Sequence, residues 1–242
     1  MRKIEFLKQK IEEMRRTEVE RESRVLTVGE LSREEAKAIE ADNAAEALVT
    51  TGLAMRQKWR ETAKPRVEAF KRNFPDIKSL QDLELLMDSM NEREFCKEVF
   101  DIKIKKTSFP RYTMLKQLVE AFRGYQEESG FDNDWKAMKH WAERVDTSNI
   151  KNDIVGKING VNLATVQNLR LLCGADTVKP DVHVKNVLKE IGLGNEVGVV
   201  ELLSALTGYS LLELDQIFWH WDRNRSKKKG EITVEEFYKL PK

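Results

Sequence analysis

Apolar residues recur along most of this chain at the three- and four-residue spacing of an α-helix, and this pattern limits the fold more than any other feature. Four stripes have the spacing i, i+3, i+4, i+7, and they consist of Ala45, Leu48, Val49 and Gly52, of Leu115, Leu118, Val119 and Phe122, of Val184, Val187, Leu188 and Ile191, and of Leu214, Ile217, Phe218 and Trp221. Such stripes are typical of helices that bury one face. Because convincing strand alternation is absent, the sequence predicts an all-α fold.

The first 40 residues carry a shorter helical pattern than the rest of the chain. The apolar residues that share this pattern are Ile4, Leu7, Ile11 and Met14. Glu18 and Arg21 then interrupt the seam, which is too short for a coiled coil. We therefore predict that residues 1–40 form an N-terminal helical extension, either docked on the rest of the protein or projecting from it as an arm.

Two serines have the spacing of a capping box. Ser32 is followed by Glu35, and Ser210 by Glu213, so we predict that a helix begins after each serine. The basic run from Arg223 to Lys229 is interpreted as a loop.

The composition favours a helix-rich protein with a well-solvated surface. The chain has 242 residues, of which 40% are apolar and 34% charged, with a formal net charge of +1. Any contact with nucleic acid must therefore come from local basic patches. Two cysteines support neither a disulfide framework nor an iron–sulfur site. No signal peptide and no apolar span of roughly 20 residues is visible, so we expect a cytoplasmic protein that does not enter a membrane.

A short hairpin is the first candidate functional feature. Residues 158–162, Ile-Asn-Gly-Val-Asn, join a short helix expected at about 148–157 to a helix expected at 164–173. Gly160 adopts positive φ freely, and Asn162 is of the type that tolerates it best among the other residues. A turn of this kind at a helix N-terminus directs backbone N–H groups outward and can hold a phosphate. The alternative is an ordinary tight turn between two helices.

A carboxylate downstream is the second candidate. Asp181 follows Lys179 and Pro180, and it stands directly before the helix that contains the Val184 stripe. Asp is a favoured N-cap residue, so the alternative is that Asp181 only caps this helix. Together with the hairpin, it forms a device that could hold a DNA strand beside an acid.

These segments resemble the helix-hairpin-helix DNA glycosylase superfamily, which includes endonuclease III and the adenine-mismatch glycosylases. The residues that match the hairpin and the helix start are Ile158, Gly160, Val161, Thr165, Asp181, His183 and Val184. The stretch Ala54–Pro75 is similar to the family segment that carries an intercalating glutamine, which falls on Gln57. The further matches in this stretch are Pro65, Phe70, Phe74 and Pro75.

The resemblance extends from about residue 42 to 221 and implies a fold. We expect two helical subdomains that flank a cleft, within a domain formed by residues 41–242. A helical barrel subdomain would span about 55–165, and the flanking helices would form the second subdomain.

Departures from the family pattern narrow the implied chemistry. The Schiff-base lysine position is Ala164, and the glutamate of the adenine-mismatch enzymes falls on Gly52. The resemblance therefore implies a monofunctional N-glycosylase of base excision repair. This hydrolase would remove a damaged or mismatched base by water attack assisted by Asp181. The iron–sulfur cysteines are absent, which leaves an alkali ion at the hairpin as the one cofactor that the resemblance allows.

The implied partner is double-stranded DNA. Residues 56–72 hold seven basic against two acidic residues, which is consistent with a DNA-facing segment and equally with a solvated helix face. The residues expected to contact DNA are Arg56, Gln57, Lys58, Gly160, Val161, Asn162, Leu163 and Thr165, with Trp59 as a candidate for the base pocket.

Two other functions stay open. Asn159 and Asn162 replace a proline and a glycine of the family hairpin, so a non-catalytic DNA-binding or regulatory module could keep the same scaffold. An assembly protein that pairs through its N-terminal arm is the third hypothesis.

Overall fold

The chain folds into two units, each with its own hydrophobic core. The computed structural model describes residues 2–55, 57–102, 110–194 and 197–230. A central unit comprises Ile39–Ala175, and a terminal unit combines Met1–Ala38 with Asp176–Lys242. Nearly all regular structure in the described residues is helical, which confirms the all-α prediction. These units are bounded at 38/39 and 175/176, whereas the sequence predicted a barrel subdomain at about 55–165.

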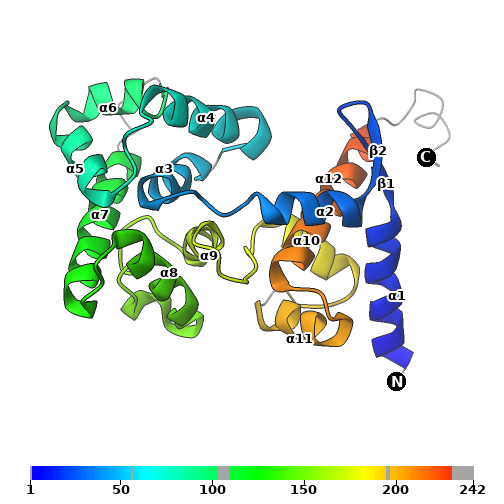
Figure 1. Cartoon of the computed structure of the whole chain (residues 1–242). Coiled ribbons are helices and arrows are strands. Elements are labelled where there is room, and N and C mark those ends of the chain that lie inside the picture. The colour runs from blue at the N-terminus through cyan, green and yellow to red at the C-terminus, as the bar shows by residue number, and fades with distance from the viewer. Residues whose placement is uncertain (1, 56, 103–109, 195–196, 231–242) are drawn as a thin grey trace, which may run out of the picture. The chain divides into compact units, whose positions relative to one another are not determined.

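The central unit is built around one buried helix (Figure 1). Its elements are α3 (Ala44–Ala54), the π-helical turn η1 (Trp59–Ala63), α4 (Lys64–Asn73), α5 (Leu80–Asp88), α6 (Glu92–Glu98), α7 (Pro110–Ser129), α8 (Asp134–Arg144), the 3-10 segment η2 (Thr147–Asn152) and α9 (Leu163–Leu172). Helix α3 packs against α4, α5, α7, α8 and α9. Every residue from Ala44 to Leu53 is buried. The predicted stripe is therefore helical, but this helix is buried on all sides because its small residues let its neighbours approach closely.

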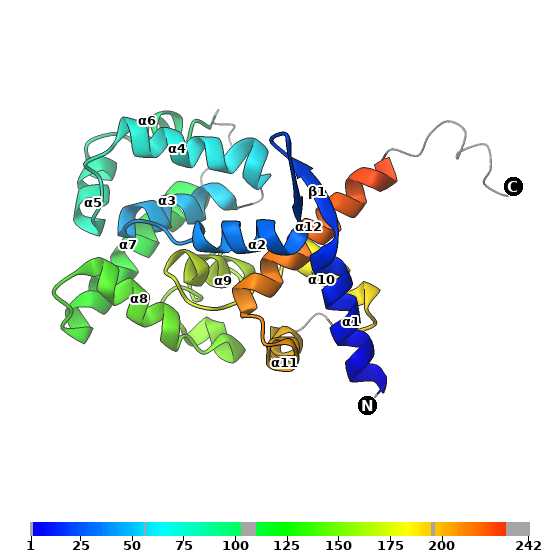
Figure 2. The same ribbon diagram turned by 45° about the vertical axis from the view of Figure 1, so that its right-hand side comes forward.

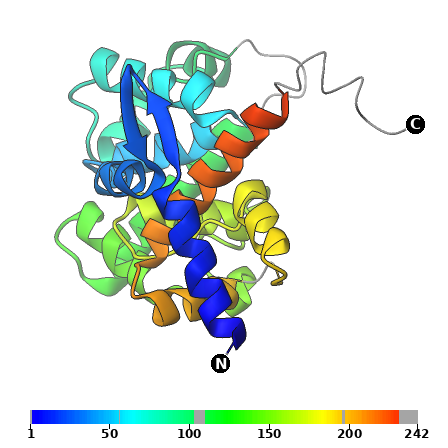
Figure 3. The ribbon, with the colours of Figure 1, turned by 90° about the vertical axis from the view of Figure 1, so that its right-hand side faces the viewer.

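The terminal unit contains the other helices and a short hairpin of strands (Figure 2). Its elements are α1 (Arg2–Arg16), β1 (Glu18–Arg21), β2 (Arg24–Thr27), α2 (Val28–Lys37), α10 (Val182–Glu190), α11 (Val197–Thr207) and α12 (Leu211–Gly230). Helix α12 packs against α1, α2, α10 and α11, and Figure 3 shows α1 and α12 crossing within this unit. The stripes of α10 and α12 supply much of its core, as predicted.

The N-terminal segment is part of this core. Leu7, Ile11 and Met14 are buried in it, whereas Ile4 is 41% exposed. The antiparallel pair β1–β2 lies between α1 and α2 in the sequence, and it was not predicted. The two strands have four residues each, which is too short to produce a visible alternation, and their turn uses positive φ at Glu22 and Ser23.

Two predictions of helix ends were wrong. Helix α2 begins at Val28 with a capping box of Thr27 and Glu30, so Ser32 lies inside the helix. Helix α12 does begin after Ser210, whose hydroxyl accepts from the Glu213 N–H. It then continues to Gly230, so the expected loop at 223–229 is helical.

Length and apolarity decide whether a described helix could span a membrane. No single helix among the described residues combines the length and apolarity needed to cross a bilayer, and α11 and α12 reach that threshold only as a pair bent by 105°.

Candidate functional site

The candidate residues are divided between the two units. The central unit contains the hairpin of residues 158–162, Gln57 and the basic segment of residues 56–72. Asp181 belongs to the terminal unit. Arg56 lies outside the described residues. The candidate residues of each unit are therefore described separately.

The hairpin turns at Gly160. The Val161 N–H donates to the Ile158 carbonyl at 3.1 Å, which closes a four-residue turn. Gly160, in its third position, has φ of +88°, a conformation that favours glycine. An added Cβ would meet nothing within 4 Å, so glycine is needed here for its backbone conformation and not for space.

Asn162 caps helix α9, which corrects the prediction of positive φ at this residue. Its φ is −130°, and its Oδ1 accepts from the Thr165 N–H at 3.0 Å. With this extended backbone, the short polar side chain can accept a hydrogen bond from an amide of the first helical turn, which would otherwise have no partner. Thr165 is buried, and its N–H is used by the cap. The amides of Leu163 and Ala164 are left as the first N–H groups of the helix, which have no intrahelical acceptor.

The segment that leads into the hairpin is helical over only part of the predicted range 148–157. It consists of the 3-10 segment η2 followed by turns, and Asp153 holds it together. One Asp153 oxygen accepts from the amides of Val155 and Gly156 at 2.8 and 3.1 Å, and the other accepts from Trp141 Nε1 at 2.9 Å. A Cβ on Gly156 would lie 1.8 Å from the Ile150 carbonyl oxygen, so only glycine permits this close approach.

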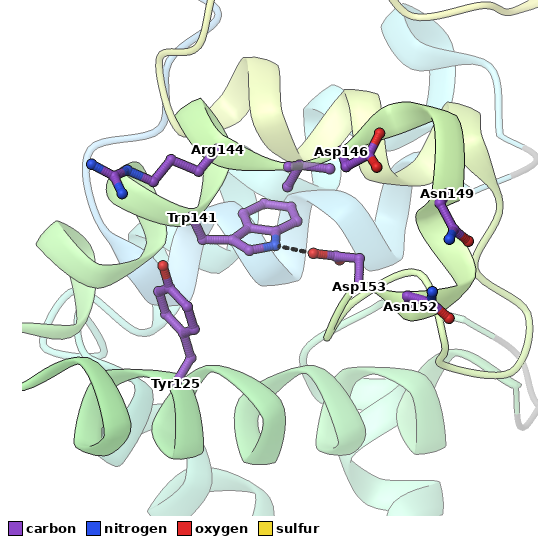
Figure 4. Close-up of a pocket in the computed structure, with 8 residues that line it drawn as sticks. Tyr125, Trp141, Arg144, Asp146, Asn149, Asn152 and Asp153 are labelled. Carbon is purple, nitrogen blue, oxygen red and sulfur yellow. Dashed lines mark hydrogen bonds between the residues drawn. The ribbon is translucent and has the colours of Figure 1, made fainter.

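A hollow of about 310 Å³ opens beside this segment (Figure 4). Its lining combines two aromatic rings with amide, carboxylate and guanidinium groups, and consists of Tyr125, Trp141, Arg144, Val145, Asp146, Asn149, Asn152 and Asp153. None of the residues predicted to bind DNA is among them. Asp153 therefore belongs both to the wall of this hollow and to the support of the hairpin.

Gln57 lies in the connection between α3 and η1. With its amide oxygen directed toward Arg111, it accepts from that guanidinium at 2.9 and 3.2 Å. Lys58 is exposed, and Trp59 is 37% exposed on the surface. Trp59 does not line the hollow described above, so its predicted role in a base pocket stays a prediction.

The basic segment is partly neutralised by neighbouring carboxylates. Lys71 Nζ lies 2.8 Å from an Asp42 oxygen and 3.2 Å from a Glu46 oxygen. Arg66 lies 3.8 Å from Asp101. The exposed Lys58 is therefore a stronger candidate for a phosphate contact than Arg66 or Lys71.

Asp181 occupies the N-cap of α10, as the simpler alternative predicted. Its N–H donates to the Lys179 carbonyl at 2.7 Å, which bends the chain around Pro180. One carboxylate oxygen, Oδ1, accepts from the amides of His183 and Val184 at 2.8 and 3.2 Å. Within the part of the chain that the structure describes, no group is hydrogen-bonded to the other oxygen, Oδ2. The half-buried carboxylate is thus fixed through one oxygen only.

A second carboxyl group acts on this segment from α12. Asp215 is only 6% exposed, and its Oδ1 accepts from the Lys179 N–H at 2.8 Å. Burial, reinforced by the negative charge of Asp181, raises the pKa of Asp215 to about 7. Asp215 was not predicted from the sequence, because an aspartate inside a helical stripe carries no motif of its own.

His183 contacts a different acid on α12. Its Nδ1 lies 2.8 Å from Oδ2 of Asp222, which is buried, and the Asn186 amide donates to the same oxygen at 3.2 Å. The Trp219 ring packs against the imidazole in a T-shaped arrangement, with 5.8 Å between the ring centroids. His183 is therefore held in one orientation at the start of α10.

Comparisons with known proteins add no family assignment. A scan of protein-family models gave no match, and neither the curated proteins nor the solved structures gave a significant one. The structure thus gives one candidate feature in each unit. The central unit has an N-terminal amide pair behind a glycine turn, and the terminal unit has a carboxylate with one fixed oxygen and one that is not hydrogen-bonded to any described residue. Such features suit phosphate binding and the stabilisation of developing positive charge, respectively.

Proposed function

We propose that the chain is a monofunctional DNA N-glycosylase with a helix-hairpin-helix glycosylase-like fold. The observation that supports this most is the arrangement of Asp181, whose Oδ1 is held by the amides of His183 and Val184 while Oδ2 is not hydrogen-bonded to any described residue. A carboxylate held in this way does not need to reorganise as positive charge develops on a sugar. The hairpin with Gly160 supplies the second support.

In the proposed reaction, a damaged or mismatched nucleotide leaves the duplex, which costs a few kcal/mol. The Leu163 and Ala164 amides bind a backbone phosphate and so position the strand without reading its sequence. Water attacks the sugar C1′ and its oxygen bonds to that carbon, while the bond from C1′ to the base nitrogen breaks and the base leaves with the electron pair of that bond. The proton that the attacking water gives up passes through solvent to the departing base. Asp181 stabilises the cationic sugar and orients the water. Ala164 has no amine, so no Schiff base forms at that position.

The second candidate is a non-catalytic DNA-binding module. Its support is that the bonds from Asp181 to the two amides fully account for an N-cap, which needs no further role. Both candidates require the hairpin to bind DNA, but only the enzyme requires the Asp181 charge.

The proposal is tested with a panel of DNA duplexes that carry different lesions, scored for abasic sites after alkali treatment. At the best substrate, Asp181→Asn should lower the rate of base release by about 100-fold or more, with DNA affinity within a few-fold of wild type. Asparagine is also a good N-cap, so this variant removes the charge and keeps the helix start. The matched control is Asp176→Asn, since Asp176 accepts from the Leu212 amide at the start of α12 at 2.9 Å.

Three outcomes separate the candidates. Full activity in Asp181→Asn would exclude the proposed mechanism. Tight duplex binding by the wild type without base release from any lesion would favour the non-catalytic module. A covalent adduct trapped by borohydride would show that a lysine elsewhere has replaced the missing amine at Ala164.

Pairing through the N-terminal arm remains a separate proposal. Helix α1 buries most of its apolar stripe within its own unit, but Phe6 is 54% exposed. A size measurement of Phe6→Ser against wild type tests whether this exposed residue holds two chains together.

A further inference from the structure

The chain segment that presents Asp181 is anchored from α12. The Asp215 Oδ1 accepts from the Lys179 N–H at 2.8 Å, and the Lys179 carbonyl accepts from the Asp181 N–H at 2.7 Å. Pro180, between them, is buried, and its ring restricts φ to the range that such a tight turn requires. Two hydrogen bonds in series therefore connect Asp215 to the backbone of Asp181.

Asp215 is itself held firmly. Its second oxygen accepts from the side-chain amide of Gln216 at 3.1 Å, and the residue is almost fully buried. The charges that act on it belong to Asp181, at the start of α10, and to Lys179 in the preceding turn. The effect of Asp181 on the raised pKa of Asp215 means that the two carboxyl groups lie within electrostatic reach of one another.

We propose that Asp215 is a positioning residue for Asp181: it fixes the turn at Lys179–Asp181 and thereby determines where the unbonded oxygen of Asp181 lies. The consequence for catalysis depends on the proposed N-glycosylase function, but the positioning itself does not. Asp215 has no direct role in bond breaking, because it is buried and both of its oxygens accept hydrogen bonds from protein groups.

A small displacement of Asp181 would have a large effect on rate. A shift of about 1 Å in a catalytic group can lower the rate of a reaction by about 100-fold. Loss of the Asp215 acceptor would release the Lys179 N–H, and the turn that it holds would gain freedom. We therefore expect a loss in the rate of base release and little change in DNA affinity, since the hairpin amides lie in the other unit.

The test compares side chains at position 215 that keep or remove the acceptor. Asp215→Asn keeps a carbonyl oxygen of the same reach, whereas Asp215→Val has a similar volume and no acceptor. Asp215→Glu keeps the charge but moves the acceptor by one methylene, and it replaces the valine variant if that chain does not fold. The matched control is Asp176→Ala, which removes another bond between the same loop and α12.

Two measurements are made on each variant: single-turnover base release, and hydrogen exchange at the amides of His183 and Val184, which donate to Asp181. We expect the valine or glutamate variant to release the base about 100-fold more slowly and to lose amide protection. The Asn variant and Asp176→Ala should stay within a few-fold of wild type.

Unchanged rate and protection in Asp215→Val, or in Asp215→Glu where it replaces the valine variant, would overturn the proposed role. Equal losses in Asp215→Asn would also overturn it, because that variant keeps the acceptor. If the wild type releases no base from any duplex, the proposed enzyme function fails, and the exchange data alone then decide whether Asp215 positions Asp181.

Discussion

The raised pKa of Asp215 predicts that this one carboxyl group makes the protein less stable as the pH rises. Its pKa is about 7 in the folded chain, against an ordinary value of 3.8. Between these two values the folded state holds a proton that the unfolded state has lost, so the free energy of unfolding falls with increasing pH. A shift of about three pKa units corresponds to about 4 kcal/mol.

Asp215→Asn removes this titration and keeps the acceptor for the Lys179 N–H. The stability of the variant relative to wild type should therefore rise by up to about 4 kcal/mol between pH 4 and pH 7, and stay constant above that range. Carboxyl groups with a lowered pKa, such as Glu12 and Asp82, make the free energy of unfolding rise with pH. They are present in wild type and in Asp215→Asn alike, so their effect cancels when the two proteins are compared.

Urea unfolding at half-unit steps of pH, followed by circular dichroism, measures this difference. The matched control is Ser210→Ala, which removes the N-cap at the start of the same helix and carries no titrating group. It should cost about 1 kcal/mol at every pH. A difference between Asp215→Asn and wild type that does not change with pH would refute both the burial argument and the assigned direction.

Three further predictions concern the central unit. Gly156→Ala should destabilise the chain by about 1–3 kcal/mol in urea unfolding, because its Cβ would overlap the Ile150 carbonyl oxygen; an unchanged midpoint would contradict the close approach. Gly160→Ala should cost about 1–2 kcal/mol through its positive φ and weaken duplex binding in a titration, with equal affinity arguing against a role of the hairpin. Lys58→Ala should lower the slope of log affinity against log salt by about one, whereas an unaltered slope would exclude a phosphate contact at Lys58.

The fold was predictable from the sequence where burial decides the local structure. The stripes at Leu115 and Val184 predicted helices because a helix that buries one face repeats its apolar residues at that spacing. The predicted helix start after Ser32 was wrong, because the capping box of Thr27 and Glu30 begins the same helix five residues earlier. The hairpin of β1 and β2 was missed because each strand pairs only four residues.

Some features of the candidate residues depend on their sequence neighbours, and others depend on residues far away along the chain. The turn at Gly160 and the cap at Asp181 depend on neighbouring residues, so the sequence alone predicted both. The bond from Lys179 to Asp215 joins residues 36 positions apart, and the contact of Gln57 with Arg111 is also distant in sequence. Such partners are determined by helix packing, which no short motif encodes.

The terminal unit draws its core from both ends of the chain, and this has a consequence for synthesis. Domains generally fold as units while the chain emerges from the ribosome, and the central unit is complete at Ala175. Leu7, Ile11 and Met14, by contrast, must wait for the residues of α12 before their apolar surface is covered. During synthesis, α1 is therefore open to chaperones and proteases for longer than the central unit, whose core needs no residue beyond Ala175.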